Sequence, residues 1–200
     1  MDKLIIEGGV PLTGVVHVSG SKNAALPILM GSILLDEPVT YTNVPDLRDI
    51  RTTFKLLELL GCPNAFENGQ VTVTPGALSP EAPYELVKTM RASVLVLGPL
   101  LARLGEARVA MPGGCAIGAR PIDLHLSALR TLGACIREEG GSLNCTAPGL
   151  SGAEIVLSLP SVGATENAML AAVGASGVTT ISNAAREPEI VDLQTFLRKL

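Results

Sequence analysis

Residues 53–62, TFKLLELLGC, and residues 125–134, HLSALRTLGA, decide how this chain is organised. Each stretch has apolar side chains at helical spacing and ends in Leu-Gly followed by a small residue, which is typical of an amphipathic helix with a glycine C-cap. The two copies lie 72 residues apart, and a similar helical pattern reaches Leu200, 68 residues after Leu132. A period near 70 residues predicts a repeated supersecondary unit that is larger than a solenoid repeat.

Each unit has the same predicted order of elements. An apolar helix comes first, a β-branched strand follows, and a loop leads into the amphipathic helix. The predicted first helices span residues 24–35, 91–104 and 167–175, the strands residues 39–41, 107–110 and 178–181, and the second helices residues 53–60, 121–132 and 190–200. Helices and strands that alternate in this way predict an α/β fold, in which helices cover small sheets.

The third unit lacks the ending that the first two have. Units one and two continue, after the glycine, into strand pairs with turns at Asn68-Gly69 and Gly140-Gly141. An apolar helix without its sheet partner leaves hydrophobic surface uncovered, so we expect this chain to be the front part of a longer protein. The alternative is a true C-terminal helix. The segment Leu4–Val18 lies outside the units and reads as two short strands that pair elsewhere.

Composition and charge exclude several classes of function. A net charge of −4 and only 2% aromatic residues argue against a nucleic-acid-binding protein. The apolar runs are too short to span a membrane, and the N-terminus has no signal-peptide pattern, so we expect a cytoplasmic protein without membrane partners. The four cysteines form no CxxC pair and there are two histidines, which argues against a metal site. We expect no cofactor.

Residues 19–23, SGSKN, form the first candidate binding segment. Ser21 or Asn23 is suited to cap the helix that follows, and the free N–H groups at a helix start favour anions. Lys22 opposes the helix dipole at this position, which a bound anion would explain. A solvated lysine near a cap is the plainer alternative.

The most informative stretch is residues 111–121, MPGGCAIGARP. Its glycines predict an exposed, adaptable loop around Cys115, and Arg120 precedes Pro121, a favoured first residue of a helix. A nearby arginine and a helix N-terminus stabilise a thiolate, as a reactive cysteine requires. The alternative is an incidental cysteine in a loop.

Two further segments carry weaker signals. Lys88 and Arg91 lie one turn apart on the helix expected to start near Tyr84, beside the small residue Ala92. Residues 161–166, SVGATE, follow a strand and open a helix, so that Gly163 and the hydroxyls are placed to meet a phosphate or a sugar. The glycine pattern matches neither a P-loop nor a dinucleotide-binding fingerprint, which argues against ATP and NAD.

Together these segments resemble one family, the UDP-N-acetylglucosamine 1-carboxyvinyltransferases, which are bacterial enolpyruvyl transferases. The resemblance runs in order over the whole chain and rests on five motifs: GSKNAALP (20–27), KTMRAS (88–93), PGGCAIGARP (112–121), SVGATEN (161–167) and NAAREPE (183–189). It implies the enolpyruvyl transferase fold, an α/β (α+β) fold of repeated βαβαββ-like units, with three units here and the third cut short. It also implies that residues 1–21 form strands of a second domain that this chain lacks, and that residues 22–200 form a first domain truncated at its C-terminal end.

The resemblance further implies a reaction and its residues. The enolpyruvyl group of phosphoenolpyruvate passes to the 3′-hydroxyl of UDP-N-acetylglucosamine through a tetrahedral phospho-ketal, phosphate leaves, and no metal is needed; this is the first committed step of peptidoglycan synthesis. Cys115, the thiol that fosfomycin alkylates, is implied as general acid, and Lys22 and Arg120 as ligands of the phosphate and carboxylate. Asn23, Arg91 and Ala92 are implied as further substrate contacts. The residues that contact the nucleotide sugar are implied to be Pro121, Ile122, Asp123, Leu124, Ser161, Val162 and Gly163.

The resemblance also has gaps. The general-base aspartate belongs to the half of the family pattern that these 200 residues do not match, so we expect the chain alone to be nearly inactive. Leu159-Pro160 stands where some members carry a lysine. Two other functions stay open: a non-catalytic binding fragment, and a related transferase acting on shikimate 3-phosphate. The Cys115 loop argues against the second.

Overall fold

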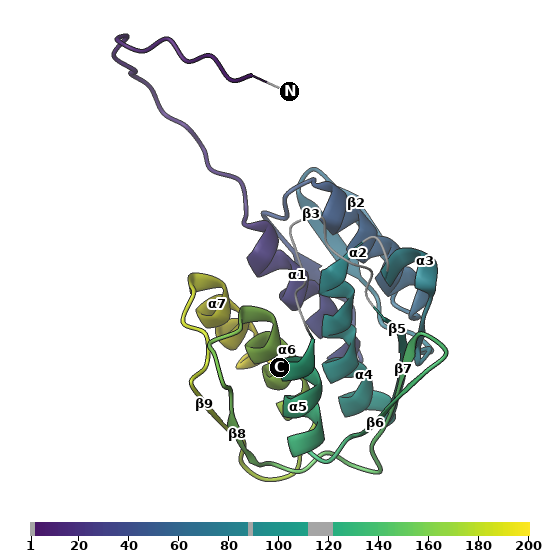
Figure 1. Ribbon diagram of the computed structural model, residues 1–200. Helices are drawn as coiled ribbons and strands as arrows, with labels where there is room; N and C mark the ends of the chain where they lie inside the picture. Colours follow the sequence, from purple (N-terminus) through teal and green to yellow (C-terminus); the bar gives the residue numbers. More distant parts are fainter. Residues whose placement is uncertain (1–2, 88–89, 112–121) are drawn as a thin grey trace.

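The computed structural model describes residues 3–87, 90–111 and 122–200. Three small sheets lie around a central group of helices, so that the helices form the core and the sheets form the periphery (Figure 1). The order of helices and strands repeats along the chain, which confirms the predicted α/β class and its repeated unit.

Unit one builds a three-stranded antiparallel sheet in the order β1-β3-β2. Its elements are α1 (Lys22–Met30), the 3-10 helix η1 (Gly31–Leu34), β1 (Val39–Tyr41), α2 (Arg48–Leu59), β2 (Asn64–Glu67) and β3 (Gln70–Val73). The β2–β3 hairpin turns at Asn68 and Gly69, whose positive φ angles of 48° and 77° match the Asn-Gly preference of tight hairpins.

Unit two repeats this order and adds a parallel strand in front of it. Its elements are β4 (Glu81–Ala82), α3 (Tyr84–Val87), the 3-10 helix η2 (Arg91–Val96), α4 (Leu97–Leu104), β5 (Glu106–Ala110), α5 (Asp123–Thr131), β6 (Cys135–Glu139) and β7 (Ser142–Thr146). The sheet has the order β4-β5-β7-β6, with β4 parallel to β5 and the other pairs antiparallel.

Unit three has the parallel pair and both helices. Its elements are β8 (Glu154–Val156), α6 (Val162–Ala172), β9 (Thr180–Ser182) and α7 (Pro188–Leu197). Strands β8 and β9 pair in parallel, as β4 and β5 do, with a helix crossing between them. Units two and three therefore share a βαβα order.

The two Leu-Gly stretches end their helices as predicted. Gly61 and Gly133 have φ angles of 93° and 103°, in the left-handed region that glycine adopts at low cost. The N–H of Cys62 donates to the carbonyl of Leu57, and the N–H of Ala134 donates to that of Leu129. This is the six-to-one hydrogen bond of the Schellman motif.

The core lies where the first helices of the units meet. Leu29, Met30, Leu97, Leu100 and Leu170 are almost completely buried. Helices α4 and α6 approach closely because Gly98 has no side chain: a Cβ there would lie 2.5 Å from the backbone oxygen of Asn167. Close packing of this kind leaves little room for larger residues.

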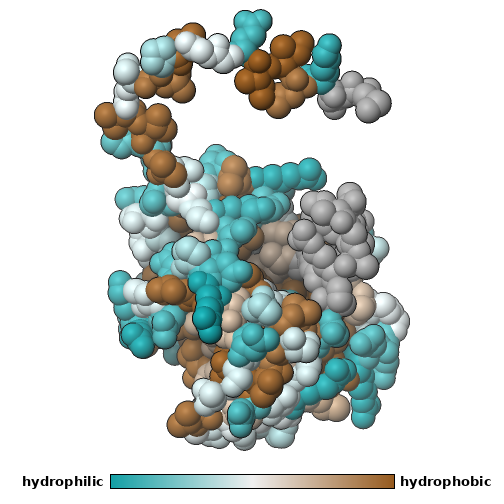
Figure 2. All heavy atoms as spheres, turned by 60° about the vertical axis from the view of Figure 1, so that its left-hand side comes forward, coloured by the Kyte–Doolittle hydropathy of each residue, from teal (hydrophilic) through white to brown (hydrophobic). Residues whose placement is uncertain are grey.

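Two sequence-based expectations differ from the described structure. Residues 3–21 contain no strand; they extend from the body with apolar side chains such as Leu4 and Leu12 in solvent (Figures 1 and 2). A strand needs a neighbour to satisfy its backbone groups, and nothing in the described structure pairs with this segment. Its place in a second domain stays a prediction. Likewise, no single helix runs from Tyr84 through Arg91: α3 is Tyr84–Val87, Met90 is extended, and η2 begins at Arg91, while Lys88 lies outside the described residues.

Candidate ligand-binding site

The starts of the first helices of all three units line one pocket of about 450 Å³. The second helices of units one and two each add a polar side chain. The lining residues are Lys22, Asn23, Leu26, Pro27, Asp49, Met90, Ala92, Val94, Leu95, His125, Ser161, Val162, Gly163 and Glu166. Because helix N-termini carry partial positive charge and free N–H groups, a pocket among them suits an anionic ligand.

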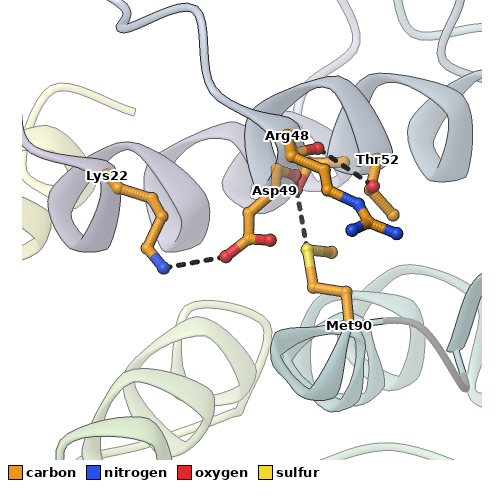
Figure 3. Close-up of polar contacts among 6 residues, drawn as sticks. Lys22, Arg48, Asp49, Thr52 and Met90 are labelled. Atoms are coloured by element: carbon orange, nitrogen blue, oxygen red, sulfur yellow. Dashed lines mark hydrogen bonds and ion pairs between the residues drawn. The ribbon is translucent and has the colours of Figure 1, made fainter. Parts of the chain in front are cut away.

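Lys22 lines the pocket and is the first residue of α1. The side chain of Ser21 caps the helix by accepting a hydrogen bond from the N–H of Ala24. The Lys22 ammonium forms an ion pair with Asp49 on α2, with 2.8 Å between Nζ and Oδ2 (Figure 3). Both side chains are more than a third exposed, so this pair contributes little stability. A ligand phosphate or carboxylate can therefore take the place of Asp49.

Helix α6 meets the pocket through a second serine cap. Ser161 has extended backbone angles, and its Oγ accepts a hydrogen bond from the N–H of Ala164 at 3.3 Å. Gly163 follows and packs against His125: a Cβ at Gly163 would lie 3.0 Å from Cε1 of the ring. The absence of a side chain therefore lets both the ring and the helix backbone reach the pocket.

A fully buried amide, Asn167, lies behind this wall. Its Oδ1 accepts a hydrogen bond from the N–H of Gly98 at 2.8 Å, and its Nδ2 donates to the carbonyl of Val94 at 3.2 Å. The same Nδ2 lies 3.2 Å from Nδ1 of His125. One side chain thus joins α6 to η2, α4 and α5, and holds the His125 ring in place.

Among the described residues, Glu166 is the one carboxyl at this wall of the pocket, and it is 4% exposed. Burial raises its pKa to about 8, and the negative charges of Glu189 and Glu187 act in the same direction. In the described part of the chain, its carboxyl forms no hydrogen bond or ion pair. At neutral pH this side chain is largely protonated, so it lines the pocket as a neutral donor or acceptor.

The structure brings together one part of the predicted site. Lys22, Asn23 and Ala92 line the pocket, as do Ser161, Val162 and Gly163. Ile122, Asp123 and Leu124 do not line it; Ile122 is buried, and Asp123 is an exposed residue in the first turn of α5. Cys115, Arg120 and Pro121 lie outside the described residues, as does the side chain of Arg91.

Sequence reasoning missed Asp49, Met90, His125 and Glu166. The sequence does carry one signal for His125, which is one of two histidines and lies on the apolar face of an amphipathic helix. Among residues 3–87, 90–111 and 122–200, no group of three or more His, Cys, Asp or Glu side chains is arranged to hold a metal ion. In the same ranges, no helix combines the length and the apolar character needed to cross a membrane.

Comparison with known sequences gives a consistent result. The EPSP synthase (3-phosphoshikimate 1-carboxyvinyltransferase) family matches residues 6–200. Proteins named UDP-N-acetylglucosamine 1-carboxyvinyltransferase are 68% identical in Nitratidesulfovibrio vulgaris, over 98% of this chain and 47% of the relative, and 62% identical in Lawsonia intracellularis, with the same coverage. The chain therefore spans about half the length of the curated relatives it matches.

Solved structures give the same fold. The enolpyruvyl transferase NikO from Streptomyces tendae superposes with a TM-score of 0.82 at 25% identity, over 96% of this chain and 46% of that one. An EPSP synthase from Acinetobacter baumannii superposes with a TM-score of 0.72 at 20% identity, over 89% and 42%. The likeness to the second shows a common fold and no more.

Proposed function

Because this chain belongs to the EPSP synthase family, we propose that it supplies one part of an enolpyruvyl transferase that acts on phosphoenolpyruvate and UDP-N-acetylglucosamine. The observation that carries the proposal is the convergence of the helix starts and Lys22 on one pocket, since both substrates are anionic. The choice of a nucleotide sugar over shikimate 3-phosphate is supported by the high identity to relatives that are named for that sugar.

The described residues have roles that follow from their positions. Lys22 exchanges its exposed partner Asp49 for an oxygen of phosphoenolpyruvate, and Asn23 offers an amide beside it. Ser161 and the backbone around Gly163 face the diphosphate of the sugar nucleotide from the start of α6. Preorganised donors of this kind act without reorganisation cost when charge develops in the reaction.

The chemical step would use the Cys115 loop. The Cys115 thiol gives its proton to the methylene carbon of phosphoenolpyruvate while the sugar 3′-hydroxyl attacks C2, which produces the tetrahedral phospho-ketal. Loss of a proton from the new methyl group and departure of phosphate then restore the double bond. Lys22 and Arg120 balance the charge on the phosphate. The base that accepts the hydroxyl proton is assigned to the remaining half of the full-length protein, which acts in the cytoplasm in peptidoglycan synthesis.

Ligand binding by this chain tests the substrate class. Calorimetric titration should show UDP-N-acetylglucosamine bound in preference to shikimate 3-phosphate, and phosphoenolpyruvate bound in its presence. Lys22→Gln should weaken phosphoenolpyruvate binding about tenfold or more, because it removes a charge-assisted hydrogen bond. Lys55→Gln is the matched control, since Lys55 is exposed on α2 outside the pocket. Preference for shikimate 3-phosphate would overturn the proposal.

Phosphate release tests the division of labour between the two halves. The wild-type chain is compared with Cys115→Ser, first alone and then with the remaining half of a relative added in trans. We expect no turnover from either chain alone, and turnover from the wild type only once the second half is supplied. Turnover by the wild-type chain alone would show that its site is complete, contrary to the expectation from the sequence.

A further inference from the structure

The hydrogen bonds of Asn167 fix which end of its amide is oxygen and which is nitrogen. The backbone N–H of Gly98 can only donate, so the atom 2.8 Å from it must be Oδ1. The carbonyl of Val94 can only accept, so the atom 3.2 Å from it must be Nδ2. The reversed amide would set two donors against each other and two acceptors against each other. Both backbone groups therefore select the same orientation.

This orientation dictates the protonation of the His125 ring. The Asn167 amide nitrogen has two hydrogens; one points to Val94, and the other is available to Nδ1 of His125, 3.2 Å away. Nδ1 must accept this hydrogen bond, so it carries a lone pair. A neutral imidazole has one N–H, and with Nδ1 as the acceptor that proton sits on Nε2.

The other edge of the ring lies at the pocket. Cε1 and Nε2 are the ring atoms nearest to Gly163, at 3.0 Å and 3.2 Å from an ideal Cβ position there. Both His125 and Gly163 line the pocket, next to the Ser161 cap of α6. The ring therefore turns its N–H edge, and not its lone pair, toward the end of the pocket formed by residues 161–163.

We propose that Asn167 is a positioning residue that locks His125 in the Nε2-protonated tautomer, so that the ring offers a hydrogen-bond donor to the anionic diphosphate at the Gly163 end of the pocket. The choice of diphosphate as the ligand rests on the proposed function; the tautomer does not. The alternative tautomer would present a lone pair to the same oxygens and repel them. Asn167 and His125 are both at least 95% buried, so their contact is largely shielded from solvent.

Nitrogen NMR of the 15N-histidine-labelled chain tests the assignment directly. The chain has two histidines, and His17 lies in the exposed N-terminal segment, so it reports the behaviour of a solvated ring in the same sample. His17→Gln removes its signals and assigns those of His125. At neutral pH we expect one His125 tautomer, protonated at Nε2, beside a solvated His17. A His125 signal from the Nδ1-protonated form, or from a mixture of the two, would overturn the proposal.

The variant Asn167→Asp replaces the hydrogen-bond donor that faces His125 with an acceptor, and the side chain keeps its size. A carboxylate accepts from the Gly98 N–H but turns an acceptor toward both the Val94 carbonyl and Nδ1. A proton on Nδ1 relieves the second of these contacts, so the ring should take one up there. Asn144→Asp is the control, because Asn144 bonds to Arg108 on an exposed sheet and should leave His125 unchanged. An unchanged His125 tautomer in folded Asn167→Asp would overturn the positioning role. If this variant fails to fold, the tautomer measured in the wild-type chain still tests the proposal.

Titration with UDP-N-acetylglucosamine separates this inference from the proposed function. We expect the Nε2 signal of His125 to shift while that of His17 does not, and Asn167→Asp to weaken binding on the order of tenfold. Binding that leaves the His125 signal in place would overturn its role as a donor. Absence of binding would overturn the proposed function and the choice of ligand, whereas the tautomer measurement would still stand on its own.

Discussion

Helices α1 and α6 begin in almost the same way, yet the sides of the pocket that they form differ in charge and in burial. Each is the first helix of its unit, and each starts at a serine with extended backbone, Ser21 with φ −78° and ψ 129° and Ser161 with φ −84° and ψ 120°. After the cap, α1 continues with Lys22, whereas α6 continues with Val162. The repeat thus supplies two equivalent helix starts, and their next residues make them different.

The two walls differ most in burial. The α1 wall presents an ion pair, Lys22 with Asp49, that is more than a third exposed. The α6 wall consists of the start of α6 and of His125 from α5, which packs against Gly163. It presents His125 and Glu166, both at least 95% buried, and is braced by Asn167. A solvated ion pair rearranges at little cost, whereas a buried and fully bonded amide does not. The α1 wall can therefore rearrange when a charged ligand binds, whereas the α6 wall has the same structure before binding.

The largest effect that we predict is a pH dependence located at the α6 wall. The folded-state pKa of Glu166 is raised from 4.5 to about 8, so folding favours its protonated form. Its contribution to stability is therefore complete below about pH 4.5 and is lost as pH rises to about 8. By linkage the loss approaches about 5 kcal/mol at most. Glu166→Gln should remove this dependence, so urea unfolding should find the variant more stable than wild type at pH 9 but not at pH 4.5.

Glu58→Gln controls for the loss of one negative charge, since Glu58 is an exposed residue of α2. Its stability relative to wild type should be the same at both pH values within about 0.5 kcal/mol. If Glu166→Gln followed wild type from pH 4.5 to 9, the Glu166 carboxyl would be solvated, and the α6 wall would be no drier than the α1 wall.

A steric change should break the α6 wall next. Gly98→Ala places a Cβ 2.5 Å from the backbone oxygen of Asn167 and 2.6 Å from its Oδ1. Helices α4 and α6 must then separate, which we expect to cost about 3 kcal/mol of unfolding free energy. Gly149→Ala is the control, because its Cβ would meet nothing within 4 Å. A neutral Gly98→Ala variant would mean that α6 adjusts freely and is not a rigid wall.

The same contrast explains what the sequence could predict. Short-range patterns located the helix ends at Gly61 and Gly133, and they picked out Lys22 and Gly163 because a charge or a glycine at a helix start is visible locally. The role of Glu166 could not be predicted, because it depends on long-range packing. Nothing near a glutamate in a helix reveals that other elements will bury it.

Long-range partners account for the other misses. Asp49 and His125 reach the pocket from second helices of different units, and only the packing of units brings them together. The strands expected in Leu4–Val18 stay a prediction for a related reason: a strand forms only with a partner, and the described part of this chain offers none. Local sequence patterns thus predicted individual residues of the site, whereas the set of residues that meet in the pocket could be seen only in the folded structure.

The two serine caps offer a matched pair of smaller changes. Ser161→Ala should cost about 1 kcal/mol, since Oγ satisfies the N–H of Ala164 in a partly buried setting. Ser21→Ala should cost less, because its bond to Ala24 is longer, 3.5 Å against 3.3 Å, and water can replace it. Chemical denaturation of both variants measures the difference. Equal losses would contradict the view that the α6 start is the drier of the two.

The smallest effect on stability should come from the α1 wall. Asp49→Asn removes the partner of Lys22, and because the pair is solvated we expect unfolding free energy to fall by less than about 1 kcal/mol. Binding should respond more clearly. With its ammonium released, Lys22 should hold phosphoenolpyruvate up to about fivefold more tightly, and added salt should reduce the gain.

Asp46→Asn separates the release of Lys22 from the general loss of a negative charge. Asp46 pairs with Arg51 at 2.6 Å near the start of the same helix, is also exposed, and does not line the pocket. Its loss changes the net charge as Asp49→Asn does but leaves Lys22 bound to Asp49. Tighter binding in Asp49→Asn alone supports an exchangeable partner. Weaker binding would mean that Asp49 aims Lys22 at the ligand, and the α1 wall would then be as preformed as the α6 wall.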